Sequence, residues 1–128
     1  MAKPRHLEFF ALRYVPNVVS AEQINVGIVA FERQEGRITF AEARFTKRLD
    51  RISAFDPDAD LEMLEATFRE MQASFEEPEK AERFVNMMLE TFSNVIQVSD
   101  RQEVLLSGDP ASEVDRLASL YLLSSAAR

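Results

Sequence analysis

Four residues on two neighbouring predicted strands could together bind an anion. Arg13 and Tyr14 lie in a segment rich in aromatic and β-branched residues, and Asn25 and Gly27 lie in the next such segment. Because side chains alternate along a strand, Asn25 and Gly27 are expected on one face, which Arg13 could share if the strands pair with matching faces. A guanidinium offers a rigid fork of donors suited to a carboxylate or a phosphate. The alternative is internal: Arg13 pairs with a carboxylate of the chain, Asn25 bonds to backbone, and Gly27 allows close packing.

A run of basic residues forms a second candidate site. Arg44, Lys47, Arg48 and Arg51 recur at spacings of three and four, which would place them on one face of a helical turn. Such a stripe could bind RNA, a phosphate or an acidic partner. It could equally neutralise the acidic helices of the same chain or be a solvated face.

The sequence lacks the usual sets of catalytic and metal-binding residues. It has no cysteine and one histidine, His6, so Cys–His pairs and His-rich metal sites cannot be built. No serine lies in a G-x-S-x-G elbow, and no glycine-rich loop could bind a phosphate. The acidic run from Asp56 resembles a calcium loop, but Leu61 stands where the turn glycine is required and Thr67 where the bidentate glutamate should be. We therefore expect no catalytic residue, no metal and no cofactor.

Charge and hydropathy narrow the choice of partners. The 128 residues carry a net charge of −7, and acids greatly outnumber bases from Asp56 to Glu82. This field repels polyanions, which makes nucleic acid an unlikely partner. No segment has the apolar length of a membrane helix, and the N-terminal residues do not form a signal peptide. A cytoplasmic protein is therefore expected.

The first part of the chain predicts three strands. Residues 7–15 are apolar on both alternating faces, which is typical of a strand inside a sheet. Residues 23–32 and 37–44 are two further extended segments, and the turn between them contains Gly36, which can adopt a positive φ. These two segments are predicted to form a hairpin.

The remainder predicts helices and two short extended stretches. Asp56-Pro57 has the form of a helix start, with Asp as the N-cap and Pro at the first helical position. An apolar stripe at helical spacing follows, formed by Leu61, Leu64, Phe68, Met71 and Phe75. A second helix is expected from Pro78, and a third after Asp109-Pro110. The inward positions of this last helix are expected to be Val114, Leu117, Leu120 and Tyr121.

The order of these elements predicts the fold class. Strands precede helices, and residues 94–99 and 103–107 look extended. This order favours an α+β fold, with a mainly antiparallel sheet of three to five strands covered on one side by about three helices. The length suits a single domain over residues 1–128.

Two sequence motifs resemble a family of bacterial proteins. They are Arg13-Tyr14-Val15-Pro16-Asn17 and Ile24-Asn25-Val26-Gly27-Ile28-Val29. Together they resemble the uncharacterised family numbered three thousand and thirty-seven among the domains of unknown function. The similarity continues through Ala43-Arg44-Phe45 and Leu105-Leu106 and covers nearly the whole chain. The resemblance implies a small protein whose gene neighbours that of a HipA-like kinase, and it assigns no residue a catalytic role.

These observations favour a non-enzymatic accessory protein that binds a protein partner, in an antitoxin-like role beside such a kinase. The partner surface would be the sheet face bearing Arg13 and Asn25, or the adjacent basic run. One alternative is a small phosphoester enzyme that binds an anion or nucleotide near Arg13, Arg44 and Arg48. Another is an RNA-binding module that uses the basic run from Arg44 to Arg51. Monomer and homodimer both stay open.

Overall fold

Two long antiparallel strands, β1 (Arg5–Asn17) and β2 (Glu22–Gln34), form the centre of the computed structural model, which describes residues 5–17, 22–90 and 96–122. β3 (Arg37–Phe45) pairs with β2 at one side of the sheet. β4 (Ile96–Val98) and β5 (Gln102–Leu106) both pair with β1 at the other side. The predicted antiparallel sheet is confirmed with five strands. Residues 94 and 95 of the predicted extended stretch lie outside the described residues.

The predicted hairpin between β2 and β3 is confirmed, and its turn is shorter than expected. Glu35 and Gly36 both have positive φ, 54° and 80°. Two consecutive residues of this kind form the turn whose twist matches that of the flanking strands. The strands can therefore run up to Gln34 and restart at Arg37.

The described residues form four helices beside the sheet, one more than predicted. They are α1 (Leu49–Phe55), α2 (Leu61–Ser74), α3 (Pro78–Glu90) and α4 (Pro110–Tyr121). The additional one, α1, is a short helix in the segment after β3. The α+β class is confirmed. No helix among the described residues is long and apolar enough to span a membrane.

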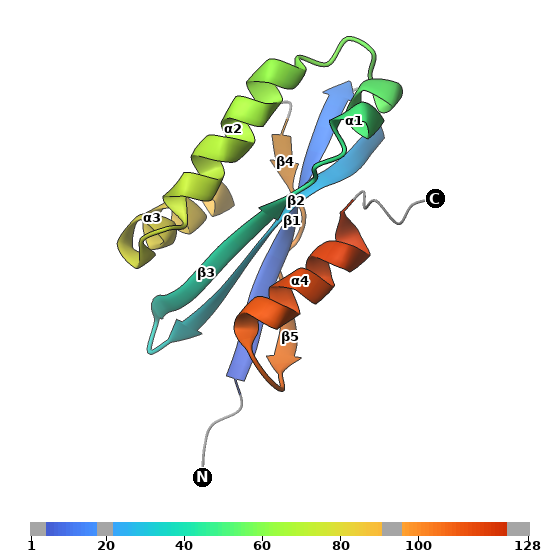
Figure 1. The fold of residues 1–128 in the computed structure, drawn as a ribbon. Coiled ribbons are helices and arrows are strands. Elements are labelled where there is room, and N and C mark those ends of the chain that lie inside the picture. Colours follow the sequence, from blue (N-terminus) through green and yellow to red (C-terminus); the bar gives the residue numbers. More distant parts are fainter. Residues whose placement is uncertain (1–4, 18–21, 91–95, 123–128) are drawn as a thin grey trace.

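The helices cover both faces of the sheet, and the expectation of one covered side is wrong (Figure 1). On one face, residues of α1, α2 and α3 pack on alternate residues of β1, such as Phe10 and Leu12. On the other face, Val114 and Leu117 of α4 pack on Leu7. β1 thus has a core on each side, which explains why its sequence is apolar on both alternating faces.

A β-bulge in β2 changes which residues share a face. Leu12 pairs with Gly27 and Arg13 pairs with Asn25, which leaves Val26 as an extra residue in β2. Val26 belongs to the core beneath α1–α3, and so does Val29. Alternation is therefore broken, and Asn25 and Gly27 lie on opposite faces instead of the common face that the sequence predicts.

The start of α2 also differs from the prediction. Its N-cap is Asp60, whose side chain accepts a hydrogen bond from the Met63 backbone N–H at 3.0 Å. Asp56 instead ends α1, where its backbone N–H donates to the Ile52 carbonyl at 2.8 Å. Residues 57–60 therefore connect two helices and do not begin one.

The prediction for α4 is confirmed at its start and wrong at one inward position. Asp109 is the N-cap, and Pro110 occupies the first turn. Val114 and Leu117 are buried as expected, but Leu120 is 65% exposed. Leu120 is therefore a surface residue of the helix.

Candidate functional site

Arg13 and Asn25 lie together on the α4 side of the sheet, as the sequence predicts. Arg13 Nε donates to Asn25 Oδ1 at 3.4 Å, and Asn25 Nδ2 donates to the Tyr121 carbonyl at 3.0 Å. Tyr121 is the last residue of α4, where backbone carbonyls lack partners within the helix and a nearby cation is favourable. The pair thus ties β1 and β2 to the end of α4, which favours the internal role over a binding site.

The other two members of the predicted group lie on the opposite face. The Tyr14 hydroxyl donates to Asp56 Oδ2 at 2.5 Å. Burial, together with this hydrogen bond to a carboxylate, raises the pKa of Tyr14 to about 12. Gly27 is packed against Phe45, and a β-carbon there would lie 2.7 Å from the ring. The four residues are therefore not brought together at one site.

The predicted basic stripe does not form a single helical face. Arg44 lies in β3, Lys47 and Arg48 lie in the connection that follows, and Arg51 lies in α1. Because Arg44 belongs to a strand, the helical spacing that predicted a common face does not apply to it.

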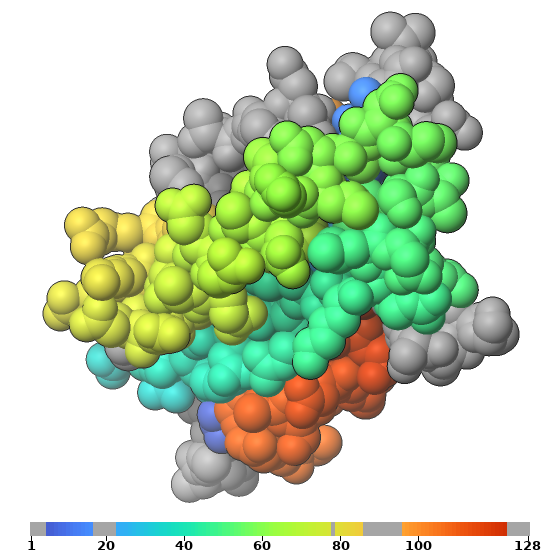
Figure 2. Space-filling view, turned by 45° about the horizontal axis from the view of Figure 1, so that its top comes forward, coloured from blue at the N-terminus to red at the C-terminus, as the bar shows by residue number. Residues whose placement is uncertain are grey.

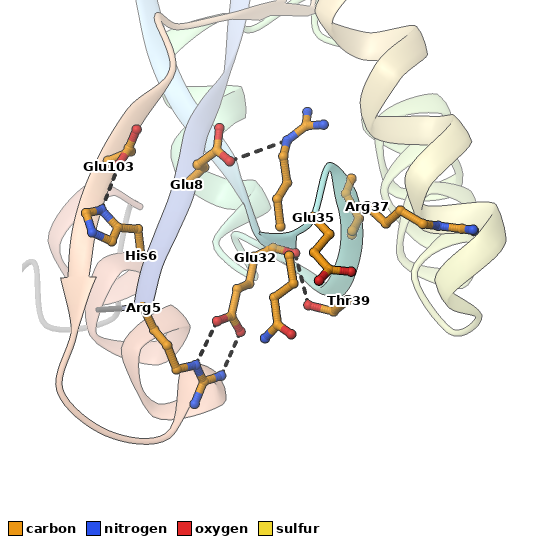
Figure 3. Close-up of a pocket in the computed structure, with 11 residues that line it drawn as sticks. Arg5, His6, Glu8, Glu32, Glu35, Arg37, Thr39 and Glu103 are labelled. Carbon is orange, nitrogen blue, oxygen red and sulfur yellow. Dashed lines mark hydrogen bonds and ion pairs between the residues drawn. The ribbon is translucent and has the colours of Figure 1, made fainter. Parts of the chain in front are cut away.

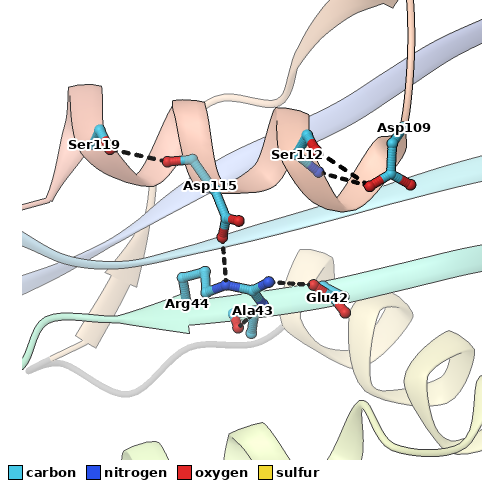
Figure 4. Close-up of polar contacts among 7 residues, drawn as sticks. All are labelled: Glu42, Ala43, Arg44, Asp109, Ser112, Asp115 and Ser119. Carbon is cyan, nitrogen blue, oxygen red and sulfur yellow. Dashed lines mark hydrogen bonds and ion pairs between the residues drawn. The ribbon is translucent and has the colours of Figure 1, made fainter.

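Two of these basic residues are paired with acids of the same chain. Arg44 contacts Glu42 at 2.6 Å and Asp115 of α4 at 3.2 Å, and it also donates to the Ala43 carbonyl (Figure 4). Arg48 donates two hydrogen bonds to Asp50, at 2.9 and 2.8 Å, which lower the pKa of that carboxyl. The charge of each guanidinium is therefore already balanced by a carboxylate of the same chain.

Lys47, like Arg51 and unlike Arg44 and Arg48, has no ion-pair partner among the described residues. It is exposed and lines a cavity of about 410 Å³ between the end of β3 and α2. The segment from β3 to α1 lies between α2 and α4 in the space-filling view (Figure 2). We call this cavity the β3–α2 groove; its lining residues are Arg44, Phe45, Thr46, Lys47, Leu49, Glu65, Phe68, Arg69 and Gln72.

Two aromatic rings and Leu49 form the apolar part of the groove. Phe45 and Phe68 stack with their ring centroids 4.9 Å apart and an interplanar angle of 14°. Phe68 is 6% exposed, and Phe45 is partly exposed. A ring or aliphatic side chain of a ligand could therefore pack on this stack while polar groups meet the rim.

The rim of the groove carries an excess of positive charge. Lys47 and Arg69 lie on it together with one acid, Glu65. Arg69 and Glu65 are separated by 3.8 Å and are both well exposed, so their ion pair is weak. In an acidic protein, this local cationic rim can attract a carboxylate.

The sequence identified only part of this groove. Arg44 and Lys47 were predicted as site residues, whereas Phe68 was assigned to the core stripe and Arg69 was not singled out. Glu65, Arg69 and Gln72 recur at spacings of four and three, which places them on one side of α2. That spacing was the available signal, but it does not show which strand end α2 faces.

A larger cavity of about 810 Å³ lies at the hairpin end of the sheet (Figure 3). Its charged residues are mostly satisfied within the chain. The Glu32 carboxylate, which is buried, accepts hydrogen bonds from Arg5 at 2.7 and 2.6 Å, and these lower the Glu32 pKa. Glu8 lies 3.4 Å from Arg33. The arrangement closes the end of the sheet and leaves little unpaired charge for a ligand.

No group of three or more His, Cys, Asp or Glu side chains in the described part of the chain is arranged to hold a metal ion. The chain is thus an α+β protein with helices on both faces of its sheet and a groove that combines aromatic rings with a lysine for which no described residue is an ion-pair partner. It belongs to the DUF3037 family of proteins of unknown function, whose family model matches residues 9–122. No curated protein and no solved structure matches the chain.

Proposed function

We propose that this protein is a non-enzymatic binding module that recognises an acidic segment of a protein partner in the β3–α2 groove. The observation that carries the proposal is the position of Lys47, which has no ion-pair partner in the described part of the chain and lies beside the stacked rings of Phe45 and Phe68. A partner segment with one large apolar side chain flanked by carboxylates would match both features. An accessory role beside a HipA-like kinase, which the family resemblance implies, is compatible with such a module.

The size of the groove supports a short peptide segment. A cavity of about 410 Å³ is near the lower end of the roughly 300–1,000 Å³ typical of ligand pockets. It can accept one large side chain and part of a second. The remaining contacts would be made by flanking residues at the cationic rim.

The alternatives have less support from the geometry. An anion-binding phosphoester enzyme would need Arg13, Arg44 and Arg48 near one another with free donors, and each already donates to another residue of the chain. RNA binding through the basic run would use Arg44 and Arg48, and both are already paired with acids of the same chain.

The experiment is an NMR titration of the ¹⁵N-labelled protein with a blocked heptapeptide, in which Val-Phe-Val is flanked by two glutamates on each side. We expect shifts confined to the backbone amides of Phe45, Lys47, Phe68 and Arg69. The apparent Kd should rise with salt, because rim contacts between exposed charges are screened. A peptide with lysines in place of the glutamates is the control and should not bind.

Charge reversal tests the role of the lysine. Lys47→Glu should lower the affinity for the glutamate peptide about tenfold, which corresponds to about 1.4 kcal/mol of binding free energy. Lys80→Glu makes the same charge change on α3, outside the groove, and should leave the affinity within about twofold. Equal effects of the two substitutions, or shifts that avoid the groove, would refute the proposed function.

A further inference from the structure

The two edges of the sheet differ in how their backbone groups are covered. At the β3 edge, the Ile38 N–H donates to Glu82 Oε2 of α3 at 3.4 Å. The Ala43 carbonyl accepts a hydrogen bond from the Arg44 guanidinium at 3.1 Å, and Ala43 is fully buried. Side chains of the same protein therefore close this edge against pairing with another strand.

The opposite edge has no such cover at β5 from the residues that the structure describes. Both backbone groups of Ala11 in β1 point toward this edge. Its N–H donates to Ser99 Oγ at 2.8 Å, and its carbonyl accepts a hydrogen bond from the Ser99 N–H at 2.9 Å. Because backbone groups alternate along a strand, Phe9 and Leu7 face the same way and meet their β5 partners, Gln102 and Val104. The backbone N–H and C=O groups of the residues between and beyond those partners must then point away from β1, toward the outside of the sheet.

These outward residues are Glu103 and Leu105. Both are exposed, Leu105 to 62%, and no described strand lies beyond β5. α4 packs mainly on β2 and β3, so it leaves this edge open. The segment Gln102–Leu106 contains neither proline nor lysine, and only its short length and the charge of Glu103 oppose the pairing of this edge. An exposed leucine on an open edge is a site for strand addition.

We propose that β5 pairs antiparallel with β5 of a second copy of the chain, about a two-fold axis that places Leu105 opposite its own equivalent. A two-fold axis pairs the outward residues in one of three ways. Glu103 opposite itself would bring like charges together, and Glu103 opposite Leu105 would leave each leucine beside a carboxylate. Leu105 opposite itself covers the exposed apolar side chain of both copies.

The resulting dimer is weak and depends on concentration. Five residues from each copy bury less than the roughly 1,200 Å² of stable complexes. Each copy carries a net charge of −7, so the two repel at low ionic strength. Added salt screens this repulsion and strengthens the dimer, whereas it weakens the binding of the acidic peptide to the β3–α2 groove.

Sedimentation equilibrium over a wide range of protein concentration tests the dimer. We expect the wild-type protein to dimerise at high concentration, and Leu105→Lys to raise the dimer dissociation constant at least tenfold. Leu120→Lys is the matched control, because Leu120 is 65% exposed on α4, and it should dimerise like the wild type. A wild-type protein that stays monomeric, or equal effects of the two substitutions, would overturn the proposal.

Cysteine cross-linking tests the register, since the chain has no cysteine of its own. Hydrogen-bonded residues on antiparallel strands have Cα atoms about 5.5 Å apart, within the range of a disulfide. Under copper–phenanthroline oxidation, Leu105→Cys should form a covalent dimer several-fold faster than Leu120→Cys. Equal rates would overturn the proposal even where Leu105→Lys fails to fold. Faster cross-linking of Glu103→Cys than of Leu105→Cys would overturn the register.

Discussion

Gly27 lies directly against the ring of Phe45, so that a β-carbon at position 27 would lie 2.7 Å from Phe45 Cδ1 and 3.2 Å from Leu12 Cδ1. The β-bulge at Val26 turns position 27 toward this ring. The same ring stacks on Phe68 in the β3–α2 groove. The absence of a side chain at position 27 therefore sets the position of the aromatic rings on which the proposed site depends.

Gly27→Ala should destabilise the protein by about 1–3 kcal/mol, because the added methyl group forces the Phe45 ring or the β2 backbone to move. Urea unfolding followed by circular dichroism measures the change in the free energy of unfolding. Gly108→Ala is the control: nothing lies within 4 Å of the added carbon, so its effect should stay within about 0.5 kcal/mol. Equal stability of the two variants would show that the ring can adjust without cost.

Tyr14→Phe should cost about 1–2 kcal/mol, because it removes a hydrogen bond from a buried hydroxyl to the Asp56 carboxylate. In the folded protein the pKa of Tyr14 is raised from 10.0 to about 12. An acid with a raised folded-state pKa stabilises the fold fully below its unfolded pKa and loses that contribution as pH rises through the folded value. Wild-type stability should therefore fall between pH 10 and 12.

Comparison of the two proteins over that pH range provides the check. The stability difference between wild type and Tyr14→Phe should shrink as pH approaches 12. Phenolate absorbance of the wild type should show a titration step near pH 12 that Tyr14→Phe lacks. A difference that stays constant from pH 10 to 12 would contradict the role of the hydroxyl as a donor to Asp56.

The sequence predicted elements that depend on neighbouring residues. The Asp109-Pro110 start of α4 is correct because capping involves only the first turn of a helix. The same dipeptide at Asp56-Pro57 misled the prediction, because Tyr14, 42 positions away in the chain, fixes the Asp56 carboxylate after α1. The extended pattern of the first three strands was sufficient to predict the hairpin.

Features set by distant contacts could not be predicted in this way. The bulge at Val26 arises from pairing with β1, and no local pattern marks it. Arg44 meets Asp115, 71 positions away, so its neutralisation depends on where α4 packs. The sequence could therefore name Arg44 and Lys47 together but could not show that Arg44 has ion-pair partners among the described residues and Lys47 has none.

The ion pair of Glu32 with Arg5 predicts a stability change in acid. Hydrogen bonds from Arg5 hold the pKa of Glu32 below its ordinary value of 4.5. A carboxyl with a lowered folded-state pKa stabilises the fold above its unfolded pKa and loses that contribution as pH falls through the folded value. Arg5→Ala should therefore be less stable than wild type at neutral pH, and the difference should narrow below pH 4.5.

Thermal unfolding at a series of pH values measures how the difference in Tm between Arg5→Ala and the wild type changes with pH. Arg101→Ala is the control, because Glu8, at 3.4 Å, is the one described residue that pairs with Arg101, and the Arg101 side chain is about as exposed as that of Arg5. At neutral pH, Arg101→Ala should lower the Tm by less than Arg5→Ala does, since Glu8 keeps Arg33 as a second partner. A difference for Arg5→Ala that does not change with pH would contradict the ion pair.

The position of the N-cap distinguishes the two possible starts of α2. The structure has Asp60 as the N-cap, whereas the sequence predicts Asp56. Asp60→Ala should cost about 1 kcal/mol, because it removes the side-chain acceptor for the Met63 N–H. Asp58→Ala removes the same charge two residues earlier, where the carboxylate accepts no hydrogen bond from a described residue, and should change stability by less than about 0.5 kcal/mol. Urea unfolding of both variants at neutral pH gives the comparison. If Asp58→Ala proved the more destabilising change, α2 would begin nearer to Pro57, as its sequence first suggests.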